Sequence, residues 1–214
     1  MNVTVLGATG ATGRQLVPVL LDRGHTVTAV VRDPARAPAG VRVVAGDVRD
    51  PAVLAAAVAG ADAVVSVLGP RGRDRDLHRT MAGHLVAAMA EAGVSRYVGV
   101  SGAGMDAPGD RKRGRDKVIS FLVQRLAGAT VADKAAELAA WQATRLDWTL
   151  VRPPRLHDGP ATGRVEHDAH RSTRSTRMSR ADLAGLLADI LEQGLYVREV
   201  PFAASAGSAP DRSR

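Results

Sequence analysis

The 214-residue chain has no cysteine and only 3% aromatic residues, and no apolar run reaches the roughly 18 residues that span a bilayer. Without cysteine, a disulfide framework and a thiol nucleophile are excluded. With so few aromatic side chains the core has to be built from alanine, valine and leucine, which suits an α/β layer fold. The length fits one well-buried domain. We expect a cytoplasmic protein with no signal peptide and no membrane partner.

Lysine is also scarce. The formal net charge of +7 comes almost wholly from arginine, because lysine occurs only at Lys112, Lys117 and Lys134. Such a charge can indicate nucleic-acid binding, but no aromatic residues alternate with the arginines to stack on bases, and no zinc-finger or helix-turn-helix spacing occurs. A phosphate-bearing ligand and a solvated surface account for the charge, so we expect no nucleic-acid partner.

Patterns for metal binding and hydrolysis are absent too. His157, His167 and His170 lie in an irregular stretch without regular ligand spacing, which predicts no metal site. No serine lies in a nucleophile elbow, and no pair of acidic residues is placed for hydrolysis.

What the chain does contain is a glycine-rich turn near its start. Met1–Leu6 is short, apolar and β-branched, as expected of a buried parallel strand, and Gly7, Gly10 and Gly13 follow before a helix. The first glycine permits a tight turn, the second lets backbone N–H groups approach a pyrophosphate, and the third lets the helix pack close to the strand. The positive end of the helix dipole also favours phosphates. The turn therefore predicts nucleotide binding.

The next two strands indicate which nucleotide. His25–Arg32 ends in a basic residue where a ribose 2′-phosphate would lie, so Arg32 predicts NADP(H). Asp33 beside it leaves a contact with the ribose of NAD open. After the third strand, Asp47 and Val48 are placed to border the adenine, although acidic residues here also cap helices.

Strands and helices continue to alternate, which requires parallel strands joined by right-handed crossovers. This pattern predicts an α/β Rossmann fold, doubly wound around a mainly parallel sheet with helices on both faces. Ligands bind beyond the carboxyl ends of such strands. The Gly7 turn, Arg32, Gly69 after the fourth strand and Ser101 after the fifth should therefore converge on one crevice.

The second half of the chain is less regular. Residues 105–128 and 155–177 lack the regular pattern, and we expect substrate-side loops there. Within the first of them, the charged stretch 106–117 is expected to be mobile and 118–126 to form a short apolar helix over the substrate site. Residues 196–202 are expected to form a seventh, edge strand. Residues 203–214 are expected to be a disordered tail, which leaves 1–202 as a single folded domain.

Several blocks spread over residues 1–202 together resemble a known family. They are GATGATG, VVRDP, GDVRD, AGADAVVSVLG, YVGVSGAG, LDWTLVRPP and SRADLAGLLADIL. As a set they resemble the atypical short-chain dehydrogenases of the NAD(P)H-binding, NmrA-like type, and most closely the biliverdin reductase B/flavin reductase branch.

The resemblance implies a Rossmann sheet of order 3-2-1-4-5-6-7 that binds NADPH at its carboxyl edge. It places Pro153, at the end of the sixth strand, near the nicotinamide. The residues that it assigns to the cofactor are Gly7, Thr9, Gly10, Thr12, Gly13, Arg32, Asp47, Leu68 and Gly69.

The resemblance does not extend to the usual catalytic pair. Ordinary short-chain dehydrogenases donate a proton from a tyrosine four residues before a lysine, whereas Thr130 stands four residues before Lys134. In the flavin-reductase branch a serine after strand five and a histidine on the following helix border the substrate. Ser101 matches the serine, and Lys134 lies at about the histidine's place. Both are candidate catalytic residues; the alternatives are that Ser101 caps a turn and that Lys134 binds the cofactor ribose.

The activity that this implies is hydride transfer from NADPH to a small-molecule substrate, a planar conjugated acceptor such as a flavin, a quinone or a related carbonyl. We expect a monomer or a weak homo-oligomer. A non-catalytic NADP(H)-sensing or partner-binding protein is an alternative, because the tyrosine is missing. A tailoring reductase or isomerase of a biosynthetic pathway is another, and the sequence does not name the substrate.

Overall fold

A six-stranded parallel sheet forms the centre of the computed structural model, which describes residues 1–69, 76–114 and 128–206. The strand order is β3-β2-β1-β4-β5-β6, and every neighbouring pair is parallel. The strands are β1 (Asn2–Leu6), β2 (Thr26–Val31), β3 (Arg42–Ala45), β4 (Ala63–Ser66), β5 (Arg96–Val100) and β6 (Asp147–Val151). The predicted α/β fold class is confirmed.

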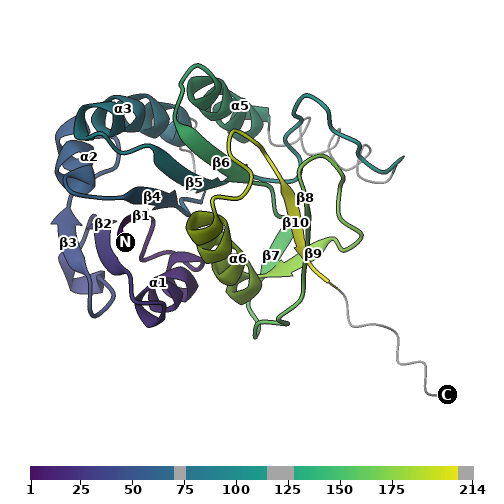
Figure 1. Cartoon of the computed structure of the whole chain (residues 1–214), viewed down its shortest axis with the longest axis horizontal. Helices are drawn as coiled ribbons and strands as arrows, with labels where there is room; N and C mark the ends of the chain where they lie inside the picture. The colour runs from purple at the N-terminus through teal and green to yellow at the C-terminus, as the bar shows by residue number, and fades with distance from the viewer. Residues whose placement is uncertain (70–75, 115–127, 207–214) are drawn as a thin grey trace.

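Helices cover both faces of this sheet (Figure 1). On one face α1 (Gly13–Asp22) packs against α6 (Arg180–Gln193). On the other face lie α2 (Pro51–Val58), α3 (Leu77–Ala92) and α5 (Gly128–Gln142). None of the described helices combines the length and the apolar character needed to cross a membrane.

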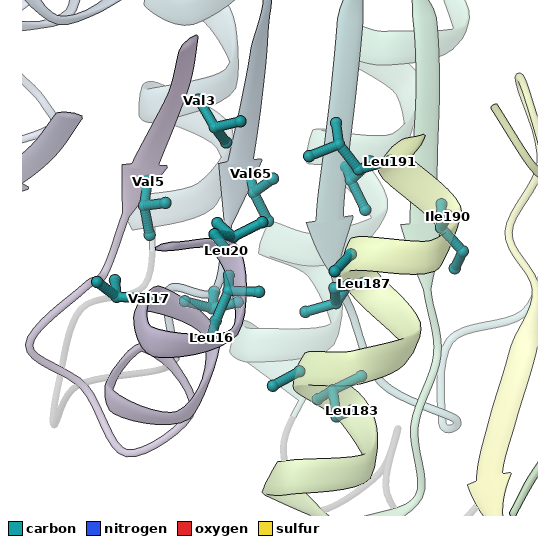
Figure 2. Close-up of a cluster of buried hydrophobic side chains, with 14 of the residues drawn as sticks. Val3, Val5, Leu16, Val17, Leu20, Val65, Leu183, Leu187, Ile190 and Leu191 are labelled. Atoms are coloured by element: carbon teal, nitrogen blue, oxygen red, sulfur yellow. The ribbon is translucent and has the colours of Figure 1, made fainter. Parts of the chain in front are cut away.

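Each face of the sheet has its own hydrophobic cluster, because successive side chains of a strand point to opposite faces. From β1, Val3 and Val5 enter one cluster and Leu6 enters the other. Figure 2 shows the first cluster, to which α1 contributes Leu16 and α6 contributes Leu187. This packing fixes the start of α1 beside the end of β1.

The seventh strand expected over residues 196–202 does not join the sheet. Tyr196 and Arg198 have φ angles of 58° and 59°, in the left-handed region, and Pro201 has no N–H to donate to a ladder. The segment therefore follows β6 only through isolated bridges. The observed sheet ends at β6, so the expected order 3-2-1-4-5-6-7 is correct only up to its sixth strand.

The disordered tail expected over residues 203–214 is wrong for residues 203–205. β10 (Phe202–Ser205) is buried and pairs antiparallel with β8 (Val165–Asp168). Residues 207–214 lie outside the described part of the chain.

Residues 155–177 also contain more regular structure than the sequence indicates. Besides β8, this stretch includes β7 (Arg155–His157), which pairs in parallel with β9 (Arg177–Ser179). These strands are only three or four residues long, and their partners are distant in the sequence. Such short strands leave no periodic pattern to read.

Candidate active site

A cavity of about 410 Å³ lies at the carboxyl edge of the sheet, a volume typical of small-ligand pockets. Its wall is formed by the segments that follow β1, β2, β3 and β4, by the first residues of α3 and α6, and by a residue of β7. Most of the residues expected to bind the cofactor lie in this wall, namely Gly7, Thr9, Gly10, Thr12, Arg32, Asp47, Val48, Leu68 and Gly69.

Nine further residues line the wall. Five of them belong to the turn, strands and strand ends predicted from the sequence, namely Ala11, Val30, Val31, Gly46 and Val67, whereas the other four were not anticipated. Arg49 follows directly after Val48, so its place in the GDVRD block was a usable signal. Leu77, Leu156 and Arg180 come from α3, β7 and α6. No local pattern shows that these distant segments reach the same cavity.

The glycine turn has the geometry that its spacing predicts. Gly7 has a φ of +90°, and the N–H of Gly10 donates to the Gly7 carbonyl oxygen at 3.0 Å, which closes the turn. A Cβ on Gly13 would lie 2.2 Å from that same oxygen and 2.7 Å from the Cα of Ala8. Gly13 therefore packs behind the turn and outside the cavity wall, where only glycine brings α1 this close.

The start of α1 fits a pyrophosphate. Thr12 is the N-cap residue, and it makes no capping side-chain hydrogen bond within the described residues. Residues 10–12 line the cavity, so the N-terminal end of the helix, where unpaired N–H groups and the positive end of the dipole lie, borders it. A glycine turn without side chains and an uncapped helix start together make a cradle for phosphate oxygens.

The cavity wall includes a basic residue after β2. Arg32 follows β2 in the wall, whereas the carboxylate of Asp33 accepts a hydrogen bond from the N–H of Ala35 at 3.1 Å and caps the short 3₁₀ turn η1 (Pro34–Arg36). Asp47 accepts from the N–H of Arg49 at 2.9 Å. The Asp33 carboxylate thus caps its own turn, whereas Arg32 lies in the cavity wall, where the sequence predicts a ribose 2′-phosphate.

Ser101 and Pro153 are not part of the cavity wall that the described residues form. The hydroxyl of Ser101 donates to Met105 Sδ at 3.4 Å, and its N–H donates to the Val151 carbonyl at 2.7 Å. Pro153 is buried, and its carbonyl accepts from the N–H of Ala103 at 3.1 Å. Both residues lie where β5 and β6 end.

Lys134 belongs to a buried polar cluster between α3, α5 and β5. Its ammonium donates to the Val100 carbonyl at 2.8 Å, to Glu137 Oε2 at 3.0 Å and to His78 Nδ1 at 2.9 Å. Burial, together with the charge of Lys134, lowers the pKa of His78 to about 3, so the ring is neutral and Nδ1 accepts. These three bonds use all the donors that an ammonium has.

Both tyrosines have partners elsewhere than at the cavity. The hydroxyl of Tyr97 donates to Glu137 Oε1 at 3.3 Å, and burial raises the pKa of this tyrosine. Burial also raises the pKa of Glu137, which the charge of Lys134 only partly opposes. The hydroxyl of Tyr196 lies 2.6 Å from His167 Nδ1. Neither tyrosine lines the cavity formed by residues 1–69, 76–114 and 128–206.

Two buried cations hold the segment after β5 against β6. Arg152 has no solvent exposure, donates to both carboxylate oxygens of Asp110 at 2.7 Å, and lies 3.8 Å from the centre of the Phe202 ring. Arg152 and Lys112 both donate to the Met105 carbonyl at 3.0 Å. This part of the predicted mobile loop is therefore held by the buried Arg152–Asp110 ion pair and by hydrogen bonds to the Met105 carbonyl. Residues 115–127 lie outside the described chain.

A model of the NAD(P)H-binding family matches residues 7–194 of the chain. An uncharacterised chloroplastic protein of Arabidopsis thaliana is 30% identical over 232 residues, which cover 99% of this chain and 79% of that protein. The chain spans only 12% of the length of curated Mycobacterium tuberculosis relatives that are 35% identical to it over 99 residues.

Solved structures show the same fold. The anaerobilin reductase ChuY of Escherichia coli O157:H7 has a TM-score of 0.81 and 23% identity, with 98% of this chain and 100% of that chain covered. A short-chain dehydrogenase/reductase of Veillonella parvula, solved in complex with NADP, has a TM-score of 0.81 and 21% identity, with 96% and 95% covered.

Proposed function

The chain belongs to the NAD(P)H-binding family, and from this premise we propose that it is an NADPH-dependent oxidoreductase acting on a planar conjugated acceptor such as a flavin, a quinone or a related carbonyl. The observation that carries the proposal is the cavity, in which the uncapped start of α1 and Arg32 lie in one wall. When bound, NADPH supplies a hydride. The protein's part is to hold the cofactor and acceptor face to face and to exclude water.

The acceptor class is supported by the residues around the site. Leu77 and Leu156, which are not among the residues expected to bind the cofactor, add apolar surface to the cavity wall that suits a flat ring. Thr130 stands where a proton-donating tyrosine would precede Lys134. Reduction of a flavin or a quinone can take its protons from water, so it needs no tyrosine, whereas an alkoxide formed from an isolated carbonyl requires a proton.

The direct test of this function is NADPH oxidation against a panel of flavins, quinones and conjugated carbonyls. We expect steady oxidation that depends on the acceptor. Tight NADPH binding without turnover of any acceptor would contradict the proposal. That result would favour an NADP(H)-sensing protein. Capture of a partner protein only in the presence of NADP(H) would then support this alternative.

Arg32 is expected to set the cofactor preference. A hydrogen bond to a charged group contributes about 1.5 to 3 kcal/mol, so NADPH should bind at least about tenfold more tightly than NADH. In Arg32→Ala, calorimetry should show this advantage lost, with NADH affinity unchanged. Arg36→Ala removes an exposed arginine in η1 outside the cavity and should leave both affinities unchanged. Equal affinities of the wild-type protein for the two cofactors would refute the assignment.

We further propose that the Ser101 hydroxyl hydrogen-bonds the acceptor and that Lys134 is a positioning residue, which holds the end of β5 through the Val100 carbonyl. Ser101→Ala and Lys134→Ala should each lower turnover by about ten- to a hundredfold, below the upper range of general acid–base catalysis. Ser101→Ala should raise the KM of the acceptor, and Lys134→Ala should mainly lower kcat.

The measurement that separates the roles of Ser101 and Lys134 is single-turnover hydride transfer at saturating NADPH. Lys134→Ala leaves Glu137 buried without its cation, so the same rate is also measured in Lys134→Ala/Glu137→Gln. Unchanged rates in these variants would remove both residues from the mechanism. Complete loss in Ser101→Ala would show that the hydroxyl is an obligatory acid.

A further inference from the structure

Arg180 brings a positive charge to the cavity from a part of the chain far from the glycine turn. It is the first residue of α6, and it lines the cavity together with Leu156 and residues 10–12 at the start of α1. Figure 1 shows α6 beside α1. The guanidinium is thus carried by the helix that packs against α1.

The ion pair of Arg180 is weakly held. Its Nη1 donates to Asp158 Oδ1 at 2.8 Å, but the Asp158 side chain is 85% exposed and that of Arg180 is 22% exposed. Exposed pairs of this kind contribute little to stability. Arg152 shows the contrast, since it is fully buried and held by both oxygens of Asp110. The geometry therefore allows Arg180 to exchange its partner.

Arg180 is also not needed to start its own helix. Ser179 is the N-cap of α6, and its hydroxyl oxygen accepts a hydrogen bond from the N–H of Asp182 at 3.0 Å. A cation at the first position of a helix also opposes the helix dipole, so it brings no stability there. Neither capping nor helix stability accounts for an arginine at this position, whereas an anionic ligand in the cavity does.

We propose that Arg180 is an anion-binding residue of the cavity, which exchanges Asp158 for an oxygen of the ligand. The planar guanidinium fork matches phosphate and carboxylate oxygens. The pyrophosphate of NADPH and a carboxylate on the acceptor share this chemistry, and the start of α1 in the same wall favours the pyrophosphate. The inference rests on the proposed function only in taking NADP(H) as the cofactor.

The test compares two ligands that differ at the pyrophosphate. NADP⁺ carries it, whereas adenosine 2′-monophosphate has only the 2′-phosphate that Arg32 is expected to bind. In Arg180→Ala, calorimetry should show NADP⁺ affinity about tenfold lower and the affinity for adenosine 2′-monophosphate unchanged. Arg32→Ala should weaken both ligands. Asp158→Ala removes the competing carboxylate and should tighten NADP⁺ binding, by up to about fivefold.

A second arm distinguishes the acceptor as the source of the anion. Binding of a carboxylated naphthoquinone and of its uncharged parent to the NADP⁺ complex is measured by calorimetry, independently of turnover. If Arg180 binds the acceptor, Arg180→Ala weakens only the carboxylated quinone and leaves NADP⁺ unchanged. If Arg180→Ala binds NADP⁺ and both quinones as tightly as the wild-type protein does, the inference is overturned. Failure of the wild-type protein to bind NADP⁺ would instead refute the proposed function.

Discussion

Asp110→Ala is expected to lower the free energy of unfolding by about 3 to 5 kcal/mol, the cost of leaving a buried charge without its partner. Arg152 has no solvent exposure, and Asp110 accepts hydrogen bonds from both of its terminal nitrogens at 2.7 Å. Without the carboxylate, the guanidinium keeps only carbonyl acceptors and the Phe202 ring. Carbonyl oxygens do not neutralise a buried cation, so the loss is large.

The matched control for Asp110→Ala is Asp158→Ala, which removes an aspartate from an exposed arginine pair. Because Asp158 is 85% exposed, this change should cost at most about 1 kcal/mol. Asp110→Ala/Arg152→Met should recover part of the loss, since it removes the unpaired charge as well. Denaturant unfolding measures all three variants, and equal losses in the two single variants would refute the explanation.

Gly13→Ala is expected to destabilise the protein by about 3 kcal/mol, the upper part of the usual range for overpacking, and to abolish measurable NADP(H) binding. The added Cβ would lie 2.2 Å from the Gly7 carbonyl oxygen and 2.7 Å from the Cα of Ala8. Both are backbone atoms, so no side-chain rotation relieves the contact. The turn has to move away from α1, and the phosphate cradle moves with it.

Gly185→Ala is the control for Gly13→Ala, because it adds the same methyl group within α6 where a Cβ would meet nothing within 4 Å. Alanine in a helix interior is favoured over glycine by roughly 0.5 to 1 kcal/mol, so this variant should be at least as stable as the wild type. Thermal unfolding and NADP⁺ calorimetry compare the two variants. If Gly13→Ala and Gly185→Ala have the same stability and the same NADP⁺ affinity, the close approach of α1 to the glycine turn affects neither property.

The Asp110–Arg152 pair joins distant segments, whereas the glycine turn lies in one contiguous stretch. Only features of the second kind can be predicted from a local stretch of sequence. β1, the glycine turn and α1 are contiguous, so the apolar strand, the spacing of Gly7, Gly10 and Gly13 and the helix that follows could be read together. The same holds for Arg32, since a residue at the end of a parallel strand must lie at the carboxyl edge of the sheet. The α/β fold is confirmed, and Gly7, Gly10 and Arg32 line one cavity.

The prediction of a seventh strand over residues 196–202 was wrong because the backbone conformation there is incompatible with a regular strand, despite the apolar pattern. The left-handed φ angles of Tyr196 and Arg198 are not apparent from residue types that rarely adopt them. Pro201 was a usable signal, since proline cannot donate to a ladder. The strand that does form, β10, depends on pairing with β8, more than thirty residues earlier in the chain.

What the sequence by itself determined is the order of the first six strands, the glycine turn after β1 and a basic residue after β2. Only the tertiary structure decided that Asp110 neutralises Arg152, that Lys134 is bound by His78, Glu137 and the end of β5, and that Arg180 reaches the cavity. The physical reason is the range of the interactions. Helix and turn signals act over a few residues, whereas all of these contacts except that of Lys134 with Glu137 join segments tens of residues apart. Only packing around the sheet brings those segments together.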